Sequence, residues 1–214
     1  MYKAYNLLRL NCLKSYSLRK YSSTRHKQMG THSSNNIVWI DLEMTGLNVE
    51  RDRIIEIACI ITDSELNITA KGPNLILHEP DSVLESMNEW CKKHHLQTGL
   101  VGAVKESRIT LEQAEKEILD FIKLYCPPKT CPMAGNSIYM DRLFISKYMP
   151  TMNDYLHYRV IDVSTIKELC KRWNNIAYSS APPKRLVHRA LDDILESIAE
   201  LTYYKKKFFQ TTTL

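Results

Sequence analysis

Ile37-Val38-Trp39-Ile40-Asp41-Leu42-Glu43 is a run of β-branched and aromatic residues that ends on two carboxylates. Such residues favour strands, so the run predicts a strand, and Thr45-Gly46-Leu47-Asn48 after it predicts a turn. Alternate side chains of a strand leave the same face, which places Asp41 and Glu43 together, roughly 6 to 7 Å apart along the backbone. Two carboxylates beside an apolar strand repel each other and resist burial unless a cation joins them. The pattern indicates a divalent metal site, although charges at an ordinary strand end would give the same sequence.

The rest of the chain predicts a mixed sheet flanked by helices. Two more β-rich runs follow closely, at 54–62 and 75–78, and their short connections predict an antiparallel three-strand meander. The apolar period then becomes helical, and prolines end helices after 125 and 148. The expected elements are helices at 83–97 and 111–125, a strand at 132–135, a helix at 141–148, a strand at 158–163, a helix at 164–173, a loop at 174–187 and a helix at 190–204. A meander followed by alternating helices and strands predicts an α/β fold whose later strands are parallel.

Length and composition narrow the class of protein. The chain has 214 residues, enough for one α/β domain with a tail but short for two such domains. No stretch approaches about 18 consecutive apolar residues, so we expect no membrane span. The six cysteines form no C-x-x-C pair, which argues against a zinc site or a disulfide framework.

The formal net charge of +5 is concentrated at the N-terminus. Seven Lys or Arg lie within residues 1–36 and no acidic residue precedes Asp41, so residues 37–214 have a net charge near −2. A mildly acidic folded part argues against binding through a broad basic surface. The acid-free N-terminus has the composition of a mitochondrial transit peptide, and Arg19-Lys20-Tyr21-Ser22 resembles a matrix processing site cleaved after Tyr21. A disordered basic arm has the same composition, and Met29 could start a shorter cytosolic or nuclear product.

Two further groups of polar residues lie at the ends of expected elements. Gly135-Asn136-Ser137 precedes a helix with Asp141 in its first turn, and His188 precedes the last helix, which carries Asp193. Glycine permits close approach of the backbone to a ligand, and carboxylates are suited to a hard cation. Each group also has an ordinary interpretation, because serine caps helices, a first-turn aspartate stabilises the helix dipole and a lone histidine is often structural. The predicted metal site is absent only if all of these ordinary interpretations are correct at once.

The resemblance to a known family rests on long local matches in a fixed order. The stretches that carry it are Trp39-Ile40-Asp41-Leu42-Glu43-Met44-Thr45-Gly46-Leu47, Arg53-Ile54-Ile55-Glu56-Ile57-Ala58, Gly135-Asn136-Ser137, Tyr158-Arg159-Val160-Ile161-Asp162-Val163-Ser164 and His188-Arg189-Ala190-Leu191-Asp192-Asp193. They are similar to the DEDDh 3′→5′ exonuclease superfamily and, within it, to the oligoribonuclease family with its eukaryotic mitochondrial form. The similarity covers about residues 37–209. The departures are the N-terminal tail, Tyr139-Met140 and the loop before His188, and none of them touches an expected ligand.

The resemblance implies an RNase H-like α/β domain over residues 37–209. Its expected activity is removal of nucleotides from the 3′ end of short oligoribonucleotides, down to dinucleotides, as nucleoside 5′-monophosphates. Two Mg²⁺ per site, about 4 Å apart and replaceable by Mn²⁺, would be held by Asp41, Glu43 and Asp193, with Asp41 bridging. Asp141 would act partly through water, and His188 would take the proton of the attacking water as general base.

Two other functions remain as alternatives. The first is the same chemistry on longer strands or on DNA, as in proofreading exonucleases, which would not need a cap on the far end of a short substrate. The second is a non-catalytic RNA-binding module that keeps the fold. All four carboxylates and His188 are present, whereas an inactive relative is expected to lose at least one of them.

The family's preference for very short RNA assigns roles to further residues. Leu47 is expected to wedge at the bases, and Trp90 and His95 to stack on them or contact them. Core packing is the alternative for Leu47 and Trp90.

The 5′-phosphate is expected to be capped by four residues, namely Ser137, Ser164, Tyr158 and Arg159. In the family the Tyr-Arg pair comes from the second subunit, so the resemblance implies a homodimer. A surface ion pair is the alternative for Arg159. Residues 1–36 are expected to be the transit peptide and basic tail, and residues 210–214 a C-terminal tail.

Overall fold

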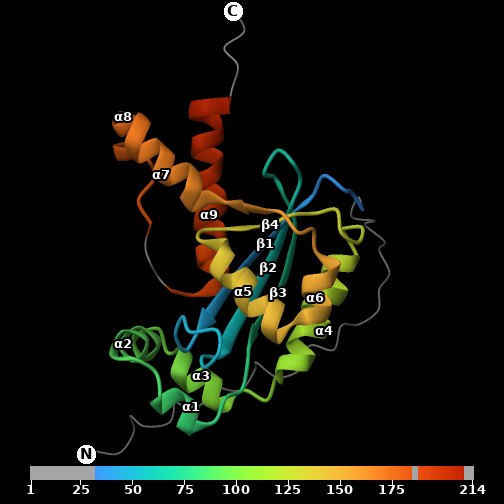
Figure 1. The fold of residues 1–214 in the computed structure, drawn as a ribbon, viewed down its shortest axis with the longest axis vertical. Coiled ribbons are helices and arrows are strands. Elements are labelled where there is room, and N and C mark those ends of the chain that lie inside the picture. The colour runs from blue at the N-terminus through green and yellow to red at the C-terminus, as the bar shows by residue number, and fades with distance from the viewer. Residues whose placement is uncertain (1–31, 185–187, 210–214) are drawn as a thin grey trace, which may run out of the picture.

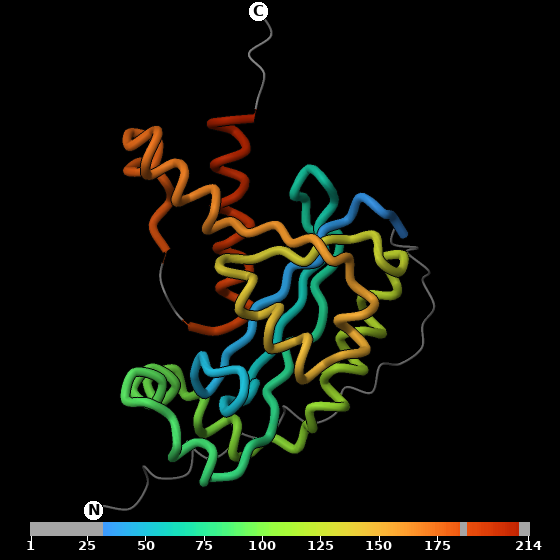
Figure 2. The backbone as a smooth tube through the Cα atoms, viewed as in Figure 1, coloured from blue at the N-terminus to red at the C-terminus, as the bar shows by residue number. Residues whose placement is uncertain are grey.

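The computed structural model describes residues 32–184 and 188–209, which form a five-stranded sheet with helices on both faces (Figures 1 and 2). The sheet order is β3-β2-β1-β4-β5. Neighbouring strands are antiparallel from β3 to β1 and parallel from β1 to β5. The strands are β1 (Ile37–Met44), β2 (Ile54–Thr62), β3 (Ile68–Ile76), β4 (Met133–Gly135) and β5 (Val160–Asp162). The predicted mixed sheet, a meander followed by parallel strands, is confirmed.

Helices occupy most of the connections between and after the strands. Between β3 and β4 lie α1 (Asp81–Glu85), α2 (Glu89–Gln97), α3 (Leu100–Glu106) and α4 (Leu111–Lys123). Between β4 and β5 lie α5 (Ile138–Tyr148) and α6 (Pro150–Tyr155). After β5 come α7 (Val163–Trp173), α8 (Asn175–Ser179) and α9 (Ala190–Tyr204), which a π-helical turn (Lys205–Phe209) extends. In the described ranges, no helix combines the length and the apolar character needed to cross a membrane.

Alternation along β1 separates two cores. Its even-numbered residues from 38 to 42 face the core that is shared with α4, α5 and α6. Ile37 and Trp39 face the core that is shared with α7 and α9. Asp41 and Glu43 continue this second series with a period of two, so they leave the sheet on the side of α9.

The carboxyl ends of β1, β4 and β5 lie at one edge of the sheet because these strands are parallel. The chain leaving β4 begins α5 at this edge, and the chain leaving β5 begins α7 there. The N-terminus of α9 lies at the same edge, close to the end of β1 (Figure 1). The end of β1 and the starts of α5, α7 and α9 therefore lie close together at this edge, although they are distant in sequence. A functional site formed by residues of these segments is expected here.

Two predicted elements are wrong in extent, and an asparagine explains each error. The helix expected at 83–97 is divided into α1 and α2, because Asn88 caps α2 by accepting the N–H of Cys91 at 2.9 Å. The loop expected at 174–187 contains α8, whose N-cap Asn174 accepts the N–H of Ala177 at 3.0 Å. An N-cap satisfies one of the free N–H groups at a helix start, and this local signal starts a helix that the apolar period does not show.

Three smaller differences concern element ends. The third strand begins at Ile68 instead of 75, and α3 after Gly99 was not expected. Pro150 does follow the end of α5, but it is also the first residue of α6, where its missing N–H costs no hydrogen bond. The other expected helices and strands are confirmed to within three residues at their ends.

Candidate active site

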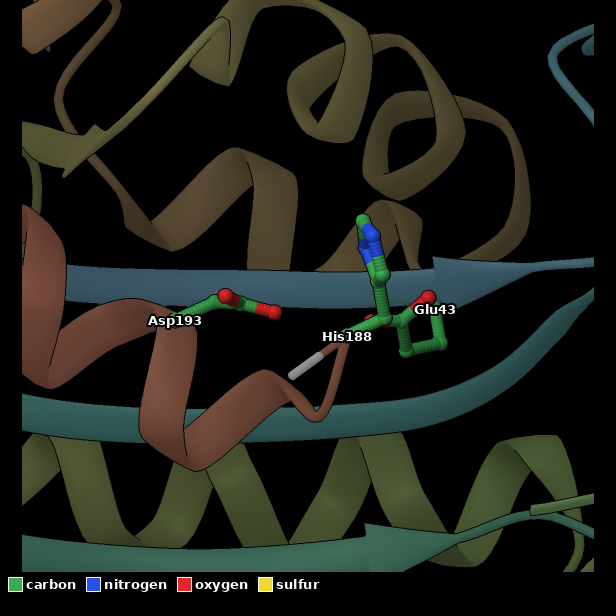
Figure 3. A group of neighbouring side chains, drawn as sticks. All are labelled: Glu43, His188 and Asp193. Carbon is green, nitrogen blue, oxygen red and sulfur yellow. The ribbon is translucent and has the colours of Figure 1, made fainter. Parts of the chain in front are cut away.

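Carboxylates from β1 and α9 come together at this edge of the sheet. α9 packs on the face to which Asp41 and Glu43 point, and it carries Asp193 in its first turn. Ligand atoms of Glu43, Asp193 and His188 lie within 4.8 Å of one another (Figure 3). Carboxylate oxygens and an imidazole nitrogen at this spacing can share a metal ion. Residues that are up to 150 positions apart in sequence thus form the group that the sequence predicts.

Asp141 reaches the same carboxylates from the first turn of α5. Its Oδ1 accepts the backbone N–H of Leu42 at 2.9 Å. Leu42 is the residue between Asp41 and Glu43, so this hydrogen bond fixes the end of β1 to the start of α5. The charge of Asp141 also acts on Asp41, where it is the main contribution to the pKa after burial. The predicted convergence of all four carboxylates is therefore present.

Burial raises the pKa of each of these carboxylates, and repulsion within the group adds to the shift for Asp41 and Glu43. Burial raises the pKa of Asp41 well above its usual value, and the neighbouring negative charges raise it further. Burial, and then the charge of Asp193, raises the pKa of Glu43 to about 8. Burial raises the pKa of Asp141 to about 7 although its hydrogen bond to the backbone opposes the shift, and burial also raises the pKa of Asp193. Glu43 and Asp141 therefore titrate near neutral pH, and a divalent cation would displace their protons.

His188 lies directly before α9 and has a left-handed backbone with φ of 53°. Its ring meets the rings of Trp90 and His94 edge-on, at centroid distances of 5.4 and 5.2 Å. A non-glycine residue in this region of φ is uncommon, which indicates that its surroundings hold it there.

A pocket of about 410 Å³ opens beside Glu43. Its lining includes Leu47 and Trp90, which are 66% and 55% exposed, so core packing is the wrong explanation for either. His95 lines the same pocket but is only 1% exposed, and its ring is too buried to stack on a base. The His95 Nε2 lies 3.0 Å from the carbonyl oxygen of Met44, and its Nδ1 lies 3.9 Å from Glu43 Oε2, so it supports the end of β1.

The turn Gly135-Asn136-Ser137 brings two of the expected phosphate-binding residues together. A Cβ at Gly135 would lie 2.8 Å from Ile138 Cδ1 and 3.0 Å from the carbonyl oxygen of Ile40, so only glycine allows the turn to lie this close to β1. The N–H of Ser137 is shared by Asp162 Oδ1 and Ser164 Oγ, both at 3.0 Å. The side chain of Ser137 makes no helix-cap hydrogen bond, so simple capping does not explain it.

Tyr158 and Arg159 do not join this group within one chain. They precede β5, whereas Ser164 follows it, and strands rise about 3.3 Å per residue, which separates the two groups by roughly 15 Å. Tyr158 is 74% exposed, and the guanidinium of Arg159 lies 5.3 Å from the centre of its ring. No ion pair of Arg159 occurs among the residues that the structure describes, so the surface ion pair considered for it is not seen.

Four charged residues around the site were not singled out from the sequence. Arg189 pairs with the fully buried Glu56 on β2, and Lys184 pairs with the buried Glu200 on α9. Glu56 interrupts an otherwise apolar strand, and a buried charge needs a partner. This glutamate was therefore the one feature of the sequence that indicated a buried ion pair. Its partner lies 133 residues away, which no local pattern reveals.

Comparison with known proteins agrees with this geometry. The family model described as exonuclease (RNase_T) matches residues 38–201. "Oligoribonuclease, mitochondrial" from Homo sapiens is 57% identical over 181 residues, which cover 85% of this chain and 76% of the relative. "Oligoribonuclease" from Ralstonia nicotianae is 50% identical over 191 residues, which cover 88% and 87%. The chain belongs to the oligoribonuclease family. It is therefore a 3′→5′ exoribonuclease, and exonucleases of this family depend on divalent metal ions.

Solved structures of more distant exonucleases share the fold. Exonuclease I from Methylocaldum szegediense superposes with a TM-score of 0.61 at 20% identity, over 82% of this chain and 41% of that protein. Escherichia coli Exonuclease I in complex with a 5cy-dA13 oligonucleotide gives a TM-score of 0.58 at 18% identity, over 80% and 40%. This chain thus spans about two fifths of the length of those proteins. At this identity they show that the oligoribonuclease-family chain has the exonuclease fold and nothing finer.

The first prediction concerns the carboxylates. Asp41→Asn, Glu43→Gln, Asp141→Asn and Asp193→Asn should each lower kcat by about 10³-fold or more, because each removes charge that a catalytic metal requires. Circular dichroism should show an intact fold, since the substitutions change charge and not core volume. Asp192→Asn, one position away on α9, is the matched control and should keep its activity. Normal turnover by the Asp41 or Asp193 variant would contradict the metal site.

The second prediction links metal binding to pH. A carboxyl whose pKa is raised by folding binds its proton more tightly in the folded state, so the stability it adds is complete below the unfolded pKa and disappears as pH rises through the folded pKa. For Glu43 this window runs from about 4.5 to about 8. The Tm of the protein in EDTA should therefore fall across this range, and saturating Mg²⁺ should raise Tm more at pH 8 than at pH 6.

Thermal unfolding in EDTA and in Mg²⁺, from pH 5 to pH 9, measures both effects. Glu43→Gln should show a smaller loss of Tm in EDTA, because one of the titrating carboxyls is gone. A Mg²⁺-induced gain in Tm that does not change with pH would show that the carboxylates are already ionised without metal.

Proposed function

We propose that the chain hydrolyses short oligoribonucleotides from the 3′ end, down to dinucleotides, to nucleoside 5′-monophosphates with two Mg²⁺ ions. The observation that supports this most strongly is the convergence of four carboxylates and His188 beside a pocket of about 410 Å³. A pocket of this size suits one or two nucleotides. The folded part has no excess of basic residues with which to hold a long strand.

The residues present fit a pair of hard cations. The donors are carboxylate oxygens, which Mg²⁺ prefers, and the pKa values of Asp41 and Glu43 are raised first by burial and then by the neighbouring carboxylates, so a bound cation would be favoured there. Asp41, Glu43 and Asp193 are the proposed ligands, and Asp141 completes the set from α5. Bound metal would supply an activated water and charge stabilisation at the leaving 3′-oxygen. Mn²⁺ has the same preference for oxygen and is expected to substitute.

His188 is the proposed general base. A ring nitrogen of His188 lies within 4.8 Å of carboxylate oxygens of Glu43 and Asp193, close enough to accept the proton of a water bound at this site. Histidine is suited to this step because its ordinary pKa, about 6.5, lies near neutral pH. The Trp90 and His94 rings limit the orientations available to the imidazole.

The two exposed residues of the pocket are proposed to bind the bases. Leu47 lies in the turn that follows β1, and Trp90 lies in α2, on the other side of the pocket. An exposed indole offers a face on which any base can stack, worth roughly 1–3 kcal/mol per base. Leu47 would lie between adjacent bases. This mode of binding does not depend on base identity, as required for an enzyme that degrades mixed sequences.

A homodimer is proposed because the phosphate cap is incomplete in one chain. Ser137 and Ser164 lie at the catalytic edge of the sheet, whereas Tyr158 and Arg159 lie at the far end of β5. A second subunit can supply the Tyr-Arg pair to this site. Exposed apolar residues on α5, β5, α7 and α8 provide a surface for such an assembly, namely Tyr139, Leu143, Val160, Trp173 and Ile176.

A mitochondrial location is proposed for this enzyme. Its relatives in Homo sapiens and Bos taurus are named as mitochondrial, and residues 1–36 have the composition of a transit peptide. Residues 1–31 and 210–214 lie outside the described residues, and the exonuclease domain is proposed to cover 37–209. A product starting at Met29 would lack the basic segment and stay in the cytosol or nucleus.

The third prediction tests the substrate length and the cap. The wild-type protein should convert 5′-labelled RNA of two to twenty nucleotides to mononucleotides, fastest for the dinucleotide, with Mg²⁺ and not with EDTA. Arg159→Ala should lower dinucleotide turnover far more than turnover of the longest strand, because the paired, charge-assisted contacts to the terminal phosphate form only on a short substrate. Lys171→Ala, an exposed cation on α7, is the control and should leave the length profile unchanged. A wild-type preference for the longest strand, or for DNA, would support the alternative of a long-strand exonuclease.

Mixing of two impaired proteins shows whether the cap acts across subunits. Asp41→Asn lacks the metal site and Arg159→Ala lacks the cap, so their heterodimer contains one complete site if the cap comes from the partner. Subunit exchange should restore dinucleotide hydrolysis. If native mass spectrometry shows heterodimers and no activity returns, the shared site is wrong.

The fourth prediction concerns the N-terminus. Deletion of residues 1–21 should move a fluorescent fusion from mitochondria to the cytosol and leave the activity of the purified enzyme unchanged, because these residues precede the first strand. A fusion in which the seven basic residues of 1–36 are replaced by serine is the matched control for charge. Import of the truncated chain into mitochondria would contradict the proposal that residues 1–21 direct the protein there.

A further inference from the structure

Two buried carboxylates lie outside the metal-binding group and form ion pairs with basic residues that flank His188 in the sequence. Glu56 on β2 is 0% exposed and Glu200 on α9 is 3% exposed. Neither belongs to the group of ligand atoms that surrounds the site. The partner of Glu56 is Arg189, immediately after His188, and a partner of Glu200 is Lys184, four residues before it.

The pair between Glu56 and Arg189 is bidentate. Arg189 Nε donates to Glu56 Oε2 at 3.0 Å, and Arg189 Nη2 donates to Glu56 Oε1 at 3.0 Å. Two parallel bonds from a planar guanidinium define direction as well as distance. Glu56 faces Glu43 across the antiparallel ladder, so Arg189 is held against the strand next to the one that carries the metal ligands.

The pair between Glu200 and Lys184 is part of a larger group of polar contacts around the buried Glu200 carboxylate. Lys184 Nζ lies 3.0 Å from Glu200 Oε2, and Lys167 Nζ from α7 lies 3.2 Å from Glu200 Oε1. Asn136 Nδ2 also donates to Glu200 Oε2 at 3.0 Å, and the hydroxyl of Tyr204 donates to Oε1 at 3.3 Å. Three partners besides Lys184 thus hold Glu200, which forms a fixed attachment for Lys184.

His188 needs support of this kind because of its backbone. Its φ of 53° lies in the left-handed region, which is sterically unfavourable for a residue with a Cβ atom. Its ring meets the rings of Trp90 and His94 edge-on, and no stacked ring partner of His188 is seen among the residues that the structure describes. A charge that is buried without its partner is costly, so each carboxylate strongly favours the arrangement in which its cation is in place.

We propose that Glu56 and Glu200 are positioning residues that hold Arg189 and Lys184, and thereby keep the imidazole of His188 at the position from which it accepts the proton. The proposal rests on the proposed role of His188 as general base. Neither carboxylate contacts substrate. Each acts through a cation on one side of His188, so loss of either pair should lower kcat while substrate and metal binding remain.

The test compares Lys184→Met and Arg189→Met with Lys167→Met in the full-length protein. Lys167 is the matched control because it pairs with the same carboxylate from a different helix. Turnover of a 5′-phosphorylated ribodinucleotide in Mg²⁺ should fall by about 10- to 100-fold in the first two variants, the size of effect expected from a small misplacement of a catalytic group. KM and the Mg²⁺ concentration for half-maximal rate should change no more than in Lys167→Met, which should keep the wild-type kcat. The Tm should fall in Arg189→Met, because the buried Glu56 loses its partner.

Substitutions that remove both charges exclude a simple folding defect. Arg189→Met leaves Glu56 buried without its partner, so Glu56→Gln/Arg189→Met examines the same position with no uncompensated charge. It should retain the Tm of the wild type more closely and still show the lower kcat. Lys184→Arg, which can keep the ion pair with Glu200, should restore most of the rate. Wild-type kcat in Lys184→Met and in the double variant would overturn the proposal, as would an equal loss in Lys167→Met.

The same substitutions in a His188→Ala background separate this inference from the proposed function. His188→Ala should itself lower kcat by about 10²- to 10⁴-fold, the usual contribution of a general base. Adding Lys184→Met should then cause no further loss, because the residue it positions is absent. A further loss in that background would mean that Lys184 acts elsewhere and overturns the positioning role. A His188→Ala protein with wild-type kcat would instead disprove the proposed base, whatever the single variants show.

Discussion

Repulsion among the carboxylates at the end of β1 is the constraint on which the rest of the structure depends. Asp41, Glu43, Asp141 and Asp193 come from three separate elements. Burial raises the pKa of each, and repulsion from the others raises the pKa of Asp41 and Glu43 further. The carboxylates cannot attract one another into place. They are held by the two cores on either side of β1 and by the hydrogen bond from Leu42 to Asp141. The apolar packing of the domain therefore opposes the repulsion, and a bound cation would remove it.

The sequence predicts the part of the site that depends on short-range pattern. β1 and its Asp-x-Glu pair follow from strand propensity and a period of two, and the first-turn positions of Asp141 and Asp193 follow from where their helices begin. The order of the strands is not a local property. Asp141 meets Leu42 only because β4 inserts beside β1 and not beside β3, and it was the family resemblance that supplied this arrangement.

Burial and charge pairing are the features that the sequence does not reveal. His95 resembles a surface histidine of an amphipathic helix, yet it is enclosed between Met44 and Glu43. Leu47 and Trp90 are of residue types common in a core, and only the family resemblance predicted them at the bases; both are exposed on the pocket. In each case the deciding fact is which distant segment packs there. The asparagine caps that start α2 and α8 are different from these cases. Asn88 and Asn174 are local helix-start signals, which the sequence contains without knowledge of distant packing.

The arrangement of Arg189 explains how the proposed base, His188, and the proposed metal ligand, Asp193, can keep a fixed separation. Its side chain is bound by Glu56 on β2, and its carbonyl oxygen accepts the N–H of Asp193 at 3.0 Å in the first turn of α9. One residue is thus tied both to the sheet and to the helix, and His188 is its covalent neighbour. A displacement of α9 relative to β2 would disturb this residue first, because its two attachments lie on opposite sides of that interface. The distance from base to metal ligand is therefore set by the packing of α9 on the sheet, so substitutions in that apolar interface should affect kcat even where they lie far from the substrate.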